Sequence, residues 1–294
     1  MSYNDYKKSG IIHKIVKQNI TSHLHNNISS LDIVQFIEND IKKLTKYNNL
    51  SPLDAGIAFP VGTSINNIAA HFTPCDDINP IVFGNDIVKI DYGVHINGCI
   101  TDGAFSWCPS GKYNDLIDIS EKATMIGIKH AGPDAVLGDI GKYIQEYIES
   151  KELEIDGKIL PVKSIYDLCG HKIAPYEIHA KKAVPNVYLP YYKVRMKPDE
   201  VYAVETFPTL GDGSIITEKE CNHFMITKYN KKFNGNTMKI YNERKTLAFC
   251  PRWFDFDIPD NKYIQKHPVL KANGVVAQYE KTIYIKNDGL AILN

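Results

Sequence analysis

The chain has 294 residues, of which 44% are hydrophobic and 23% are charged. These fractions are ordinary for a globular protein, and the length is enough for one large domain or two ordinary ones. Lysine plus arginine and aspartate plus glutamate number 34 each, so the formal net charge is zero. This balance argues against a protein that binds nucleic acid through a broad basic face.

The first fifty residues are predicted to be helical. Apolar residues recur there at three- and four-residue steps, at Leu31, Val34, Ile37, Ile41 and Leu44. Ser29 stands three residues before Asp32, which is the spacing of a helix N-cap. The polar residues 1–8 leave no apolar core for a signal peptide, and no apolar run approaches the ~20 residues that span a bilayer.

Asp91 and Asp102 are predicted to lie on the same face of a β-hairpin. Two β-rich runs within residues 86–107 flank Asn97-Gly98, a pair typical of a two-residue turn. Counting back from this turn places Gly93 opposite Asp102, so Asp91 is the diagonal neighbour of Asp102. Diagonal neighbours lie roughly 7–8 Å apart, which allows two carboxylates to share metal ions. The alternative is a pair of solvated aspartates, but the apolar flanks favour a buried sheet.

An α+β fold with antiparallel pairing is predicted from the elements that follow. Two helices are marked by apolar residues from Leu116 to Ile126 and from Leu137 to Ile148, and Pro133-Asp134 is expected to open the second. Strand-like runs return at Val201–Phe207 and Val275–Ile285. Strands, then two helices, then strands are typical of this class rather than of a parallel sheet.

The segment of about residues 224–272 differs in composition from its surroundings. It is rich in lysine and asparagine from Lys228 to Asn236 and aromatic from Phe249 to Phe256. We therefore predict an inserted subdomain within a single domain that spans residues 1–294. The six cysteines form no C-x-x-C pair, which favours reduced thiols and a cytoplasmic protein.

Three further elements carry residues suited to metal binding. His171 follows a glycine that would let the backbone approach closely, while Glu205 and Glu280 each lie in an apolar strand-like run. Singly, each has an ordinary interpretation as a structural histidine or a half-buried edge residue. With Asp91 and Asp102 they supply four carboxylates and one imidazole, a set suited to two divalent first-row ions. Two such ions can activate one water molecule and polarise a carbonyl, which predicts hydrolysis.

Seven stretches carry a family resemblance: Gly56-Ile57-Ala58-Phe59-Pro60, Asn66-Asn67-Ile68-Ala69-Ala70-His71, Lys89-Ile90-Asp91-Tyr92-Gly93, Gly170-His171, Ile178-His179-Ala180, Ala203-Val204-Glu205-Thr206-Phe207 and Thr246-Leu247-Ala248-Phe249-Cys250. With them the chain resembles the pita-bread metallopeptidases, and within these the type 2 methionine aminopeptidases. The resemblance implies two pseudo-symmetric halves, an antiparallel sheet flanked by helices, an inserted helical subdomain and two divalent metal ions (Co, Mn, Fe or Zn).

The resemblance also assigns the metal ligands. Asp91 would chelate one ion, while Asp102 and Glu280 would bridge both. His171 and Glu205 would hold the other ion. Glu205 would also act as general base and then as general acid.

The resemblance further implies a substrate site. His179 would hydrogen-bond the substrate or its developing oxyanion, and His71 would contact the scissile region. The methionine pocket would be lined by Phe59, Gly62, Ile178, Phe207, His223 and Ala248. Buried structural histidines and core packing are the alternative interpretations. Three residues depart from the family pattern, namely Pro175, Lys181 and His267, and none of them is a predicted ligand.

The implied function is removal of the initiator methionine from nascent polypeptides whose second residue is small. We expect a monomer that binds polypeptide N-termini, with no membrane contact and no direct nucleic-acid binding, and transient ribosome association is left open. One rival is an aminopeptidase P or prolidase of the same fold, which would keep the same ligands. A second rival is a ribosome- or RNA-binding pseudoenzyme, which would have lost them.

Overall fold

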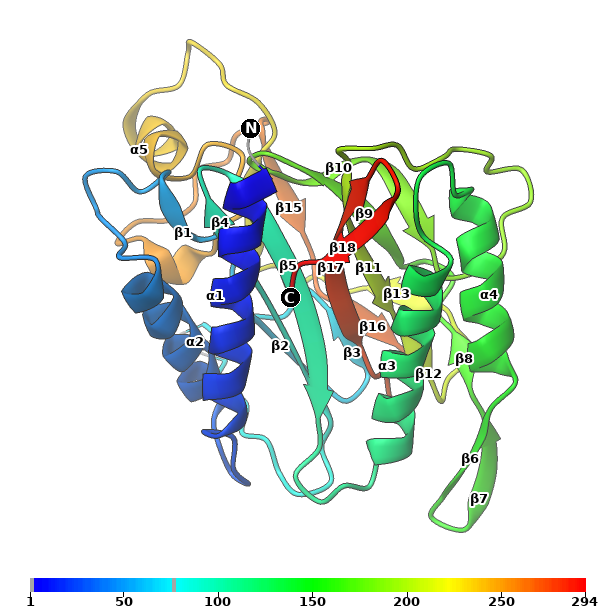
Figure 1. The fold of residues 1–294 in the computed structure, drawn as a ribbon. Helices are drawn as coiled ribbons and strands as arrows, with labels where there is room; N and C mark the ends of the chain where they lie inside the picture. Colours follow the sequence, from blue (N-terminus) through cyan, green and yellow to red (C-terminus); the bar gives the residue numbers. More distant parts are fainter. Residues whose placement is uncertain (1–2, 76–77) are drawn as a thin grey trace.

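Two antiparallel sheets form the centre of the computed structural model, which describes residues 3–75 and 78–294 (Figure 1). The first has the order β1-β4-β2, with β5 also paired to β4, and the second has the order β10-β9-β11-β17-β18. Their strands are β1 (Ala55–Ile57), β2 (Gly62–Ile65), β4 (Val88–Ile96), β5 (Cys99–Trp107), β9 (Cys169–Ala174), β10 (Glu177–Pro185), β11 (Val201–Thr206), β17 (Tyr279–Lys286) and β18 (Gly289–Ile292). The predicted α+β class with antiparallel pairing is confirmed.

Smaller sheets surround this centre. A three-stranded sheet has the order β13-β16-β3, and β6, β8 and β14 pair with β7, β12 and β15 respectively. Their bounds are β3 (Ile68–Ala70), β6 (Glu152–Ile155), β7 (Lys158–Pro161), β8 (Lys163–Ser164), β12 (Pro208–Thr209), β13 (Ile215–Thr217), β14 (His223–Ile226), β15 (Ile264–His267) and β16 (Leu270–Ala272).

Four long helices cover one face of the two central sheets, as Figure 1 shows. They are α1 (Tyr3–Thr21), α2 (Ser30–Leu44), α3 (Asn114–Lys129) and α4 (Leu137–Glu149). α1 packs on β4 and β5, and α3 packs on β11 and β17. Most of the apolar residues that predicted these helices are buried, while Leu31, Leu44 and Ile126 are half-buried. Each fully buried side chain stabilises the packing by roughly 1.5–3 kcal/mol. No helix in the described part of the chain is long and apolar enough to cross a membrane.

The predicted hairpin and helix cap are confirmed. Asn97 and Gly98 both have positive φ, at 50° and 78°, as a two-residue turn with matching twist requires. β4 and β5 pair with Gly93 opposite Asp102, so the counted register is the observed one. The Ser29 side chain accepts a hydrogen bond from the backbone N–H three residues later at the start of α2.

Two predicted boundaries were wrong. Pro133-Asp134 does not open α4, because Asp134 adopts a left-handed φ of 62° and the helix begins at Leu137 with Val136 as its N-cap. The run Val275–Ile285 begins as a strand only at Tyr279. Its first residues bond instead to the segment that follows β11, through Leu210 N to Val275 O.

The segment of residues 224–272 contains the helix α5 (Gly235–Arg244) and a short 3-10 turn (Pro251–Trp253). Pairing of β14 with β15 brings the two ends of this segment together. It has an apolar cluster of its own, which includes Phe233, Ile240 and Phe249. β16, however, pairs with β13 and β3 outside the segment. The division of the chain into a domain with this insert stays a prediction.

Candidate active site

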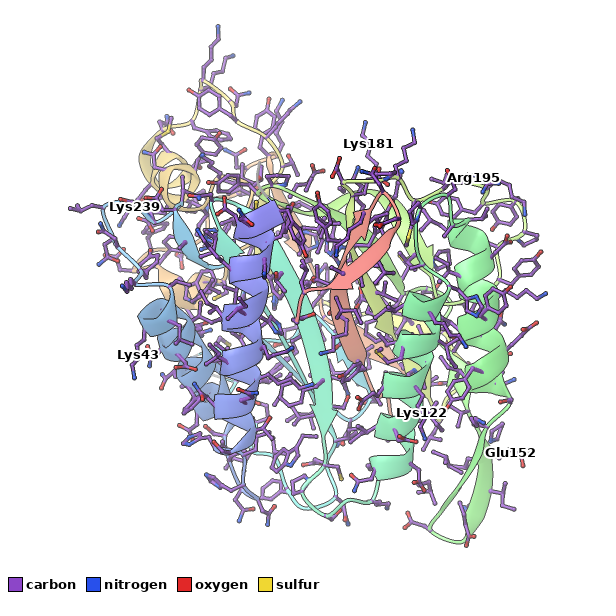
Figure 2. The ribbon with its side chains drawn as sticks, viewed as in Figure 1. Lys43, Lys122, Glu152, Lys181, Arg195 and Lys239 are labelled. Carbon is purple, nitrogen blue, oxygen red and sulfur yellow. The ribbon has the colours of Figure 1, made fainter. Side chains whose placement is uncertain are left out.

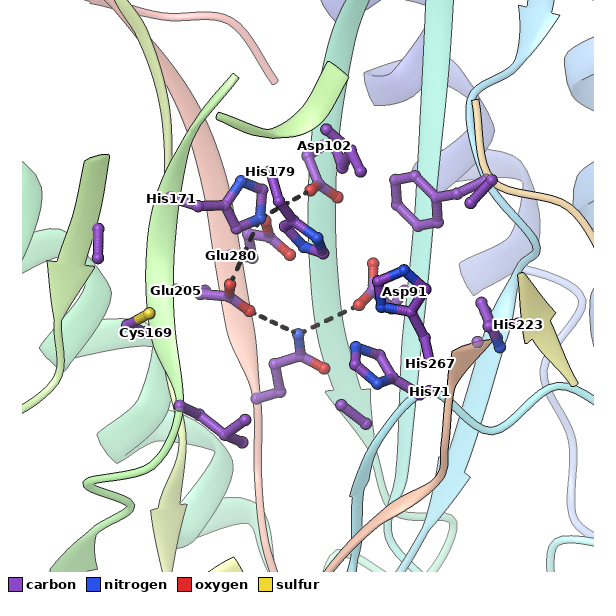
Figure 3. Close-up of a pocket in the computed structure, with 18 of the residues that line it drawn as sticks. His71, Asp91, Asp102, Cys169, His171, His179, Glu205, His223, His267 and Glu280 are labelled. Carbon is purple, nitrogen blue, oxygen red and sulfur yellow. Dashed lines mark hydrogen bonds and ion pairs between the residues drawn. The ribbon is translucent and has the colours of Figure 1, made fainter. Parts of the chain in front are cut away.

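A cavity of about 370 Å³ is lined by residues of both central sheets. Every candidate residue predicted from the sequence lines it: Phe59, Gly62, His71, Asp91, Asp102, His171, Ile178, His179, Glu205, Phe207, His223, Ala248 and Glu280. Figure 3 shows the charged and imidazole groups pointing toward one another across this cavity.

Strand register places the five predicted metal ligands together. Asp91 and Asp102 come from β4 and β5 of the first sheet. In the second sheet Glu205 of β11 pairs directly with Glu280 of β17, and His171 of β9 pairs with the residue two before Glu205. Since side chains alternate along a strand, all three side chains of the second sheet share one face.

Three of these residues form a compact cluster. Asp102, His171 and Glu280 each offer a ligand atom, and these atoms lie within 4.8 Å of one another. The Nε2 atom of His171 is 3.6 Å from Oδ2 of Asp102 and 3.7 Å from Oε1 of Glu205. Asp91 lies across the cavity from Glu205, and the two carboxylates are connected by a glutamine amide between them (Figure 3).

Burial makes ionisation of these carboxyl groups unfavourable. It raises the pKa of Asp91 to about 7. Burial first, and then the charges of neighbouring carboxylates, raise the pKa values of Asp102, Glu205 and Glu280 well above their usual range. In residues 3–75 and 78–294, no lysine or arginine lies within ion-pair distance of these four groups. Among the described residues, a protonated His171 would be the only cation within ion-pair distance of these groups.

The donor set fits divalent metal ions. One oxygen of each of Asp91, Asp102 and Glu280 is buried without a hydrogen-bond partner among the described residues. Buried oxygens without a partner cost free energy unless a ligand or ion satisfies them. Burial also lowers the pKa of His171 to about 4, so its imidazole is neutral near pH 7 and available as a ligand. Oxygen-rich sites with one imidazole suit first-row divalent ions.

The sequence profile of metallopeptidase family M24 matches residues 4–287. The chain belongs to this family. It is 37% identical over 310 residues to methionine aminopeptidase 2 of Dictyostelium discoideum, covering 99% of this chain and 70% of that protein. It is 36% identical to methionine aminopeptidase 2 of Yarrowia lipolytica and 37% identical to methionine aminopeptidase 2A of Arabidopsis thaliana. Those alignments cover 97% and 93% of this chain but 64% and 63% of the relatives. Within family M24, the chain thus falls among the type 2 methionine aminopeptidases.

Solved structures of lower sequence identity share the M24 fold. Methionine aminopeptidase from Thermotoga maritima superposes with a TM-score of 0.69 at 18% identity, covering 100% of this chain and 97% of that one. A thermophilic Arx1 reaches 0.76 at 15% identity, covering 100% and 91%. Prolidase from Pyrococcus furiosus reaches 0.61 at 14% identity, covering 99% and 62%. Together with the family match, these neighbours confirm the predicted pita-bread fold.

A group of histidines lies beside the five predicted ligands in this M24 chain. The Nδ1 atom of His71 donates a hydrogen bond to the backbone oxygen of Pro268 at 3.1 Å. The ring of His267, at the end of β15, lies 5.8 Å from the ring of His71 and 6.1 Å from that of His179. Burial lowers the pKa values of His71 to about 4 and of His223 to about 3, so both are neutral near pH 7.

The apolar wall of the cavity depends on a glycine. A Cβ atom at Gly93 would lie 2.3 Å from Cε1 of Phe59, so only glycine lets that ring pack against β4. Ile178 and Phe207 are buried on the same cavity. Each of these side chains packs in the core and also faces the cavity, so the core-packing and pocket-wall interpretations are compatible.

The residues that depart from the family pattern have different positions. His267 lines the cavity, and its Nε2 atom is buried without a partner among the described residues. Lys181 lines the rim, and its side chain projects outward at the top of Figure 2. Pro175 lies in the turn between β9 and β10.

Gln278 is a site residue that the sequence interpretation missed. Its Nε2 atom donates to Asp91 at 3.3 Å and to Glu205 at 3.2 Å, so one amide joins ligands of both sheets. Its position two residues before Glu280 was the available signal, because residues two apart in an extended chain share a face.

Proposed function

We propose that this chain is a two-metal aminopeptidase that removes the initiator methionine from polypeptides whose second residue is small. The convergence of three buried carboxylates, the half-buried Asp91 and one neutral imidazole on a single cavity supports this proposal most directly. The curated relatives named methionine aminopeptidase support the substrate.

Two divalent ions, Co, Mn, Fe or Zn, would be held by the five ligands. Asp91 would hold one ion, His171 and Glu205 would hold the other, and Asp102 and Glu280 would serve both. Such ions lower the pKa of a bound water molecule and polarise a carbonyl. A pair of cations would also remove the cost of burying four like charges, because opposite charges favour the ionised carboxylates.

Glu205 moves the proton in this proposal. It accepts a proton from the attacking water and gives it to the leaving amine, as general base and then general acid. The hydrogen bond from Gln278 fixes one oxygen of Glu205 and leaves the other directed toward His171. His179 is exposed to the cavity and donates a hydrogen bond to the oxyanion that develops on the scissile carbonyl.

The apolar end of the cavity holds the methionine side chain. Phe59, Ile178, Phe207 and Ala248 provide the walls, while His71 contacts the scissile region. Gly62 lies against Asp91, with 3.4 Å from a Cβ placed there to Cβ of Asp91. A Cβ atom at this position would be in van der Waals contact with Asp91.

We also propose that the protein acts in the cytoplasm as a monomer on nascent polypeptide N-termini. The zero net charge supports the absence of direct nucleic-acid binding. Transient ribosome association would bring the substrate close and needs no contact with RNA.

The test is release of methionine from Met-Ala-Ser and Met-Pro peptides by the purified protein with Mn(II) or Co(II). We expect release that depends on the metal and is lost in Asp102→Ala. A folded, metal-loaded wild-type protein that releases no methionine would refute the proposal and favour the pseudoenzyme. Cleavage restricted to Xaa-Pro bonds would favour the prolidase alternative.

A further inference from the structure

The two central sheets meet at a seam between β5 and β17 that no backbone ladder crosses. β5 pairs with β4, and β17 pairs with β11 and β18, in separate sheets. Side-chain hydroxyl groups take the place of the ladder. The Ser106 hydroxyl donates to Gln278 O at 2.9 Å and accepts from Gln278 N at 2.8 Å. The Thr282 hydroxyl accepts from Asp102 N at 2.8 Å and donates to Asp102 O at 2.7 Å.

Asn294 adds two hydrogen bonds to the bridge between Asp102 and Thr282. Its Oδ1 atom accepts from Thr282 N at 2.9 Å, and its Nδ2 atom donates to Asp102 O at 2.7 Å. A backbone N–H can only donate and a carbonyl can only accept, so these two bonds fix the orientation of the amide. Two side chains from outside its own sheet therefore hydrogen-bond to the main chain of Asp102. Thr282 lies in the second sheet, and Asn294 follows the last strand of that sheet. Thr282 lies two residues beyond Glu280, so the same bridge also ties the strand of the second bridging ligand.

The side chain of His13 in α1 hydrogen-bonds to the Asn294 amide. Burial lowers the pKa of His13 to about 3, so the ring is neutral. Its Nε2 atom lies 3.0 Å from Tyr92 O and must donate to that carbonyl. The Nδ1 atom then carries no proton and accepts from Asn294 Nδ2 at 3.3 Å. The His13 ring stacks on Tyr92 at 4.1 Å, and Tyr92 directly follows Asp91.

Gly103, the residue after Asp102, leaves the space that Asn294 needs. A Cβ atom at Gly103 would lie 2.2 Å from Nδ2 of Asn294 and 2.7 Å from Cε1 of His13. The end of the chain lies in front of the seam, between α1 and β17 (Figure 1). Asn294 and His13 also line a second cavity of about 190 Å³. Loss of the Asn294 amide would therefore leave open space beside the Asp102 carbonyl.

We propose that Asn294 is a positioning residue for the metal centre, and that its amide fixes the bridging ligand Asp102 relative to Glu280 across the seam. This inference rests on the proposed metal-dependent function. Partners that orient metal ligands typically change metal affinity or activity by about 10–100-fold when they are removed. Asn294 does not line the active-site cavity and hydrogen-bonds to the backbone oxygen of Asp102, so its effect passes through that backbone.

The decisive variant is Asn294→Asp, which keeps the shape of the side chain and loses both N–H donors. An aspartate oxygen would face the Asp102 carbonyl and the bare Nδ1 atom of His13, where two acceptors repel. We expect Co(II) affinity, measured by calorimetry, to fall about 10–100-fold, and the visible absorption spectrum of bound Co(II) to change. The kcat for Met-Ala-Ser should fall while KM stays within about threefold. Ile292→Ala, an exposed position on β18, is the matched control and should leave all readouts unchanged.

If Asn294→Asp does not fold, two substitutions of Thr282 test the same proposal. Thr282→Val removes the hydroxyl bridge to Asp102 at nearly constant volume, and Thr282→Ser retains it. We expect Thr282→Val to weaken Co(II) binding and alter its spectrum, and Thr282→Ser to restore both.

Four outcomes distinguish the two proposals. Wild-type affinity and an unchanged spectrum in folded Asn294→Asp, or in Thr282→Val where Asn294→Asp does not fold, would overturn the positioning role. A fall in the melting temperature of the metal-free protein with no change in Co(II) binding would also overturn it, because the amide would then be merely structural. A wild-type protein that binds no Co(II) would overturn both proposals. A wild-type protein that binds two Co(II) ions but releases no methionine would refute the proposed function alone.

Discussion

The half-buried carboxylate of Glu200 and the four carboxylates of the cavity have pKa values shifted in opposite directions. Glu200 accepts hydrogen bonds from the ammonium groups of Lys172 at 2.9 Å and Lys182 at 2.7 Å, and from the Tyr202 hydroxyl. Burial alone would raise its pKa, but the bonds from Lys182, Tyr202 and Lys172 lower the pKa of Glu200 to about 2. In the cavity, burial raises the pKa values of all four site carboxyl groups.

The difference lies in where the compensating cation comes from. Glu200 has its partners within the chain, so its charge is neutralised by folding itself. The four carboxylates of the cavity face one another and one imidazole, and burying such a set without cations is costly. A protein retains such an arrangement where a ligand brings the missing charge. Carboxylates paired within the fold therefore indicate stability, and unpaired buried carboxylates indicate a site.

The largest difference between the two groups should appear on substitution of Asp102. We expect Asp102→Asn to lower kcat/KM for Met-Ala-Ser by more than about 10³-fold, because a proposed ligand of both metal ions is lost. The metal-free variant should melt at or above the wild-type temperature, since a buried carboxyl group whose ionisation is unfavourable is removed. Metal analysis and thermal melting measure both effects. Full metal content with wild-type activity would contradict this assignment.

The next largest difference between Glu200 and the cavity carboxylates should appear when the metal ions are removed. Ions that bind only the folded state at 100 times their Kd stabilise it by about 2.7 kcal/mol, which corresponds to roughly 4–5 °C for a chain of this size. We therefore expect a chelator to lower the melting temperature of wild type by this amount. Glu200→Gln should show the same shift, and Asp102→Asn should show little. An equal shift in all three proteins would place the stabilising ions elsewhere.

The smallest expected effect is on Glu200 itself. We expect Glu200→Gln to lose about 1.5–3 kcal/mol of stability, because it removes hydrogen bonds to a charged group, while kcat stays within about twofold. The pKa of Glu200 is depressed in the fold from a usual value of 4.5 to about 2. Its contribution is therefore complete above about pH 4.5 and is lost as the pH falls toward 2. Denaturant unfolding of both proteins from pH 7 to pH 3 measures this, and parallel pH profiles would disprove it.

The positions of Asp91 and Asp102 followed from sequence because they depend on local geometry. A two-residue turn at Asn97-Gly98 fixes the register, and the two-residue period of a strand then fixes the face. The start of α4 did not follow, because Asp134 adopts a left-handed conformation and Asp134 N bonds to Met196 O, a residue far along the chain. Local helix-start signals carry no information on such contacts.

Gln278 shows a different limit. Its spacing from Glu280 indicates a shared face, but its function depends on reaching Asp91 and Glu205 from two sheets at once. The burial of Asn294 was even less predictable, because no sequence pattern marks a polar residue near the end of a strand as buried. Both residues act across the seam, where side chains replace the backbone ladder.

The sequence by itself determined the local elements of this protein: the capped helix α2, the β4–β5 hairpin with its register, and the order of carboxylates and histidine that marks family M24. These features depend on residues a few positions apart in the sequence or on short sequence motifs. Tertiary structure alone decided that β5 and β17 meet edge to edge, that four carboxylates become buried together, and that Asn294 and His13 support them from behind. Burial and desolvation arise only when distant segments pack, so the shifted pKa values that distinguish the site from Glu200 are properties of the fold.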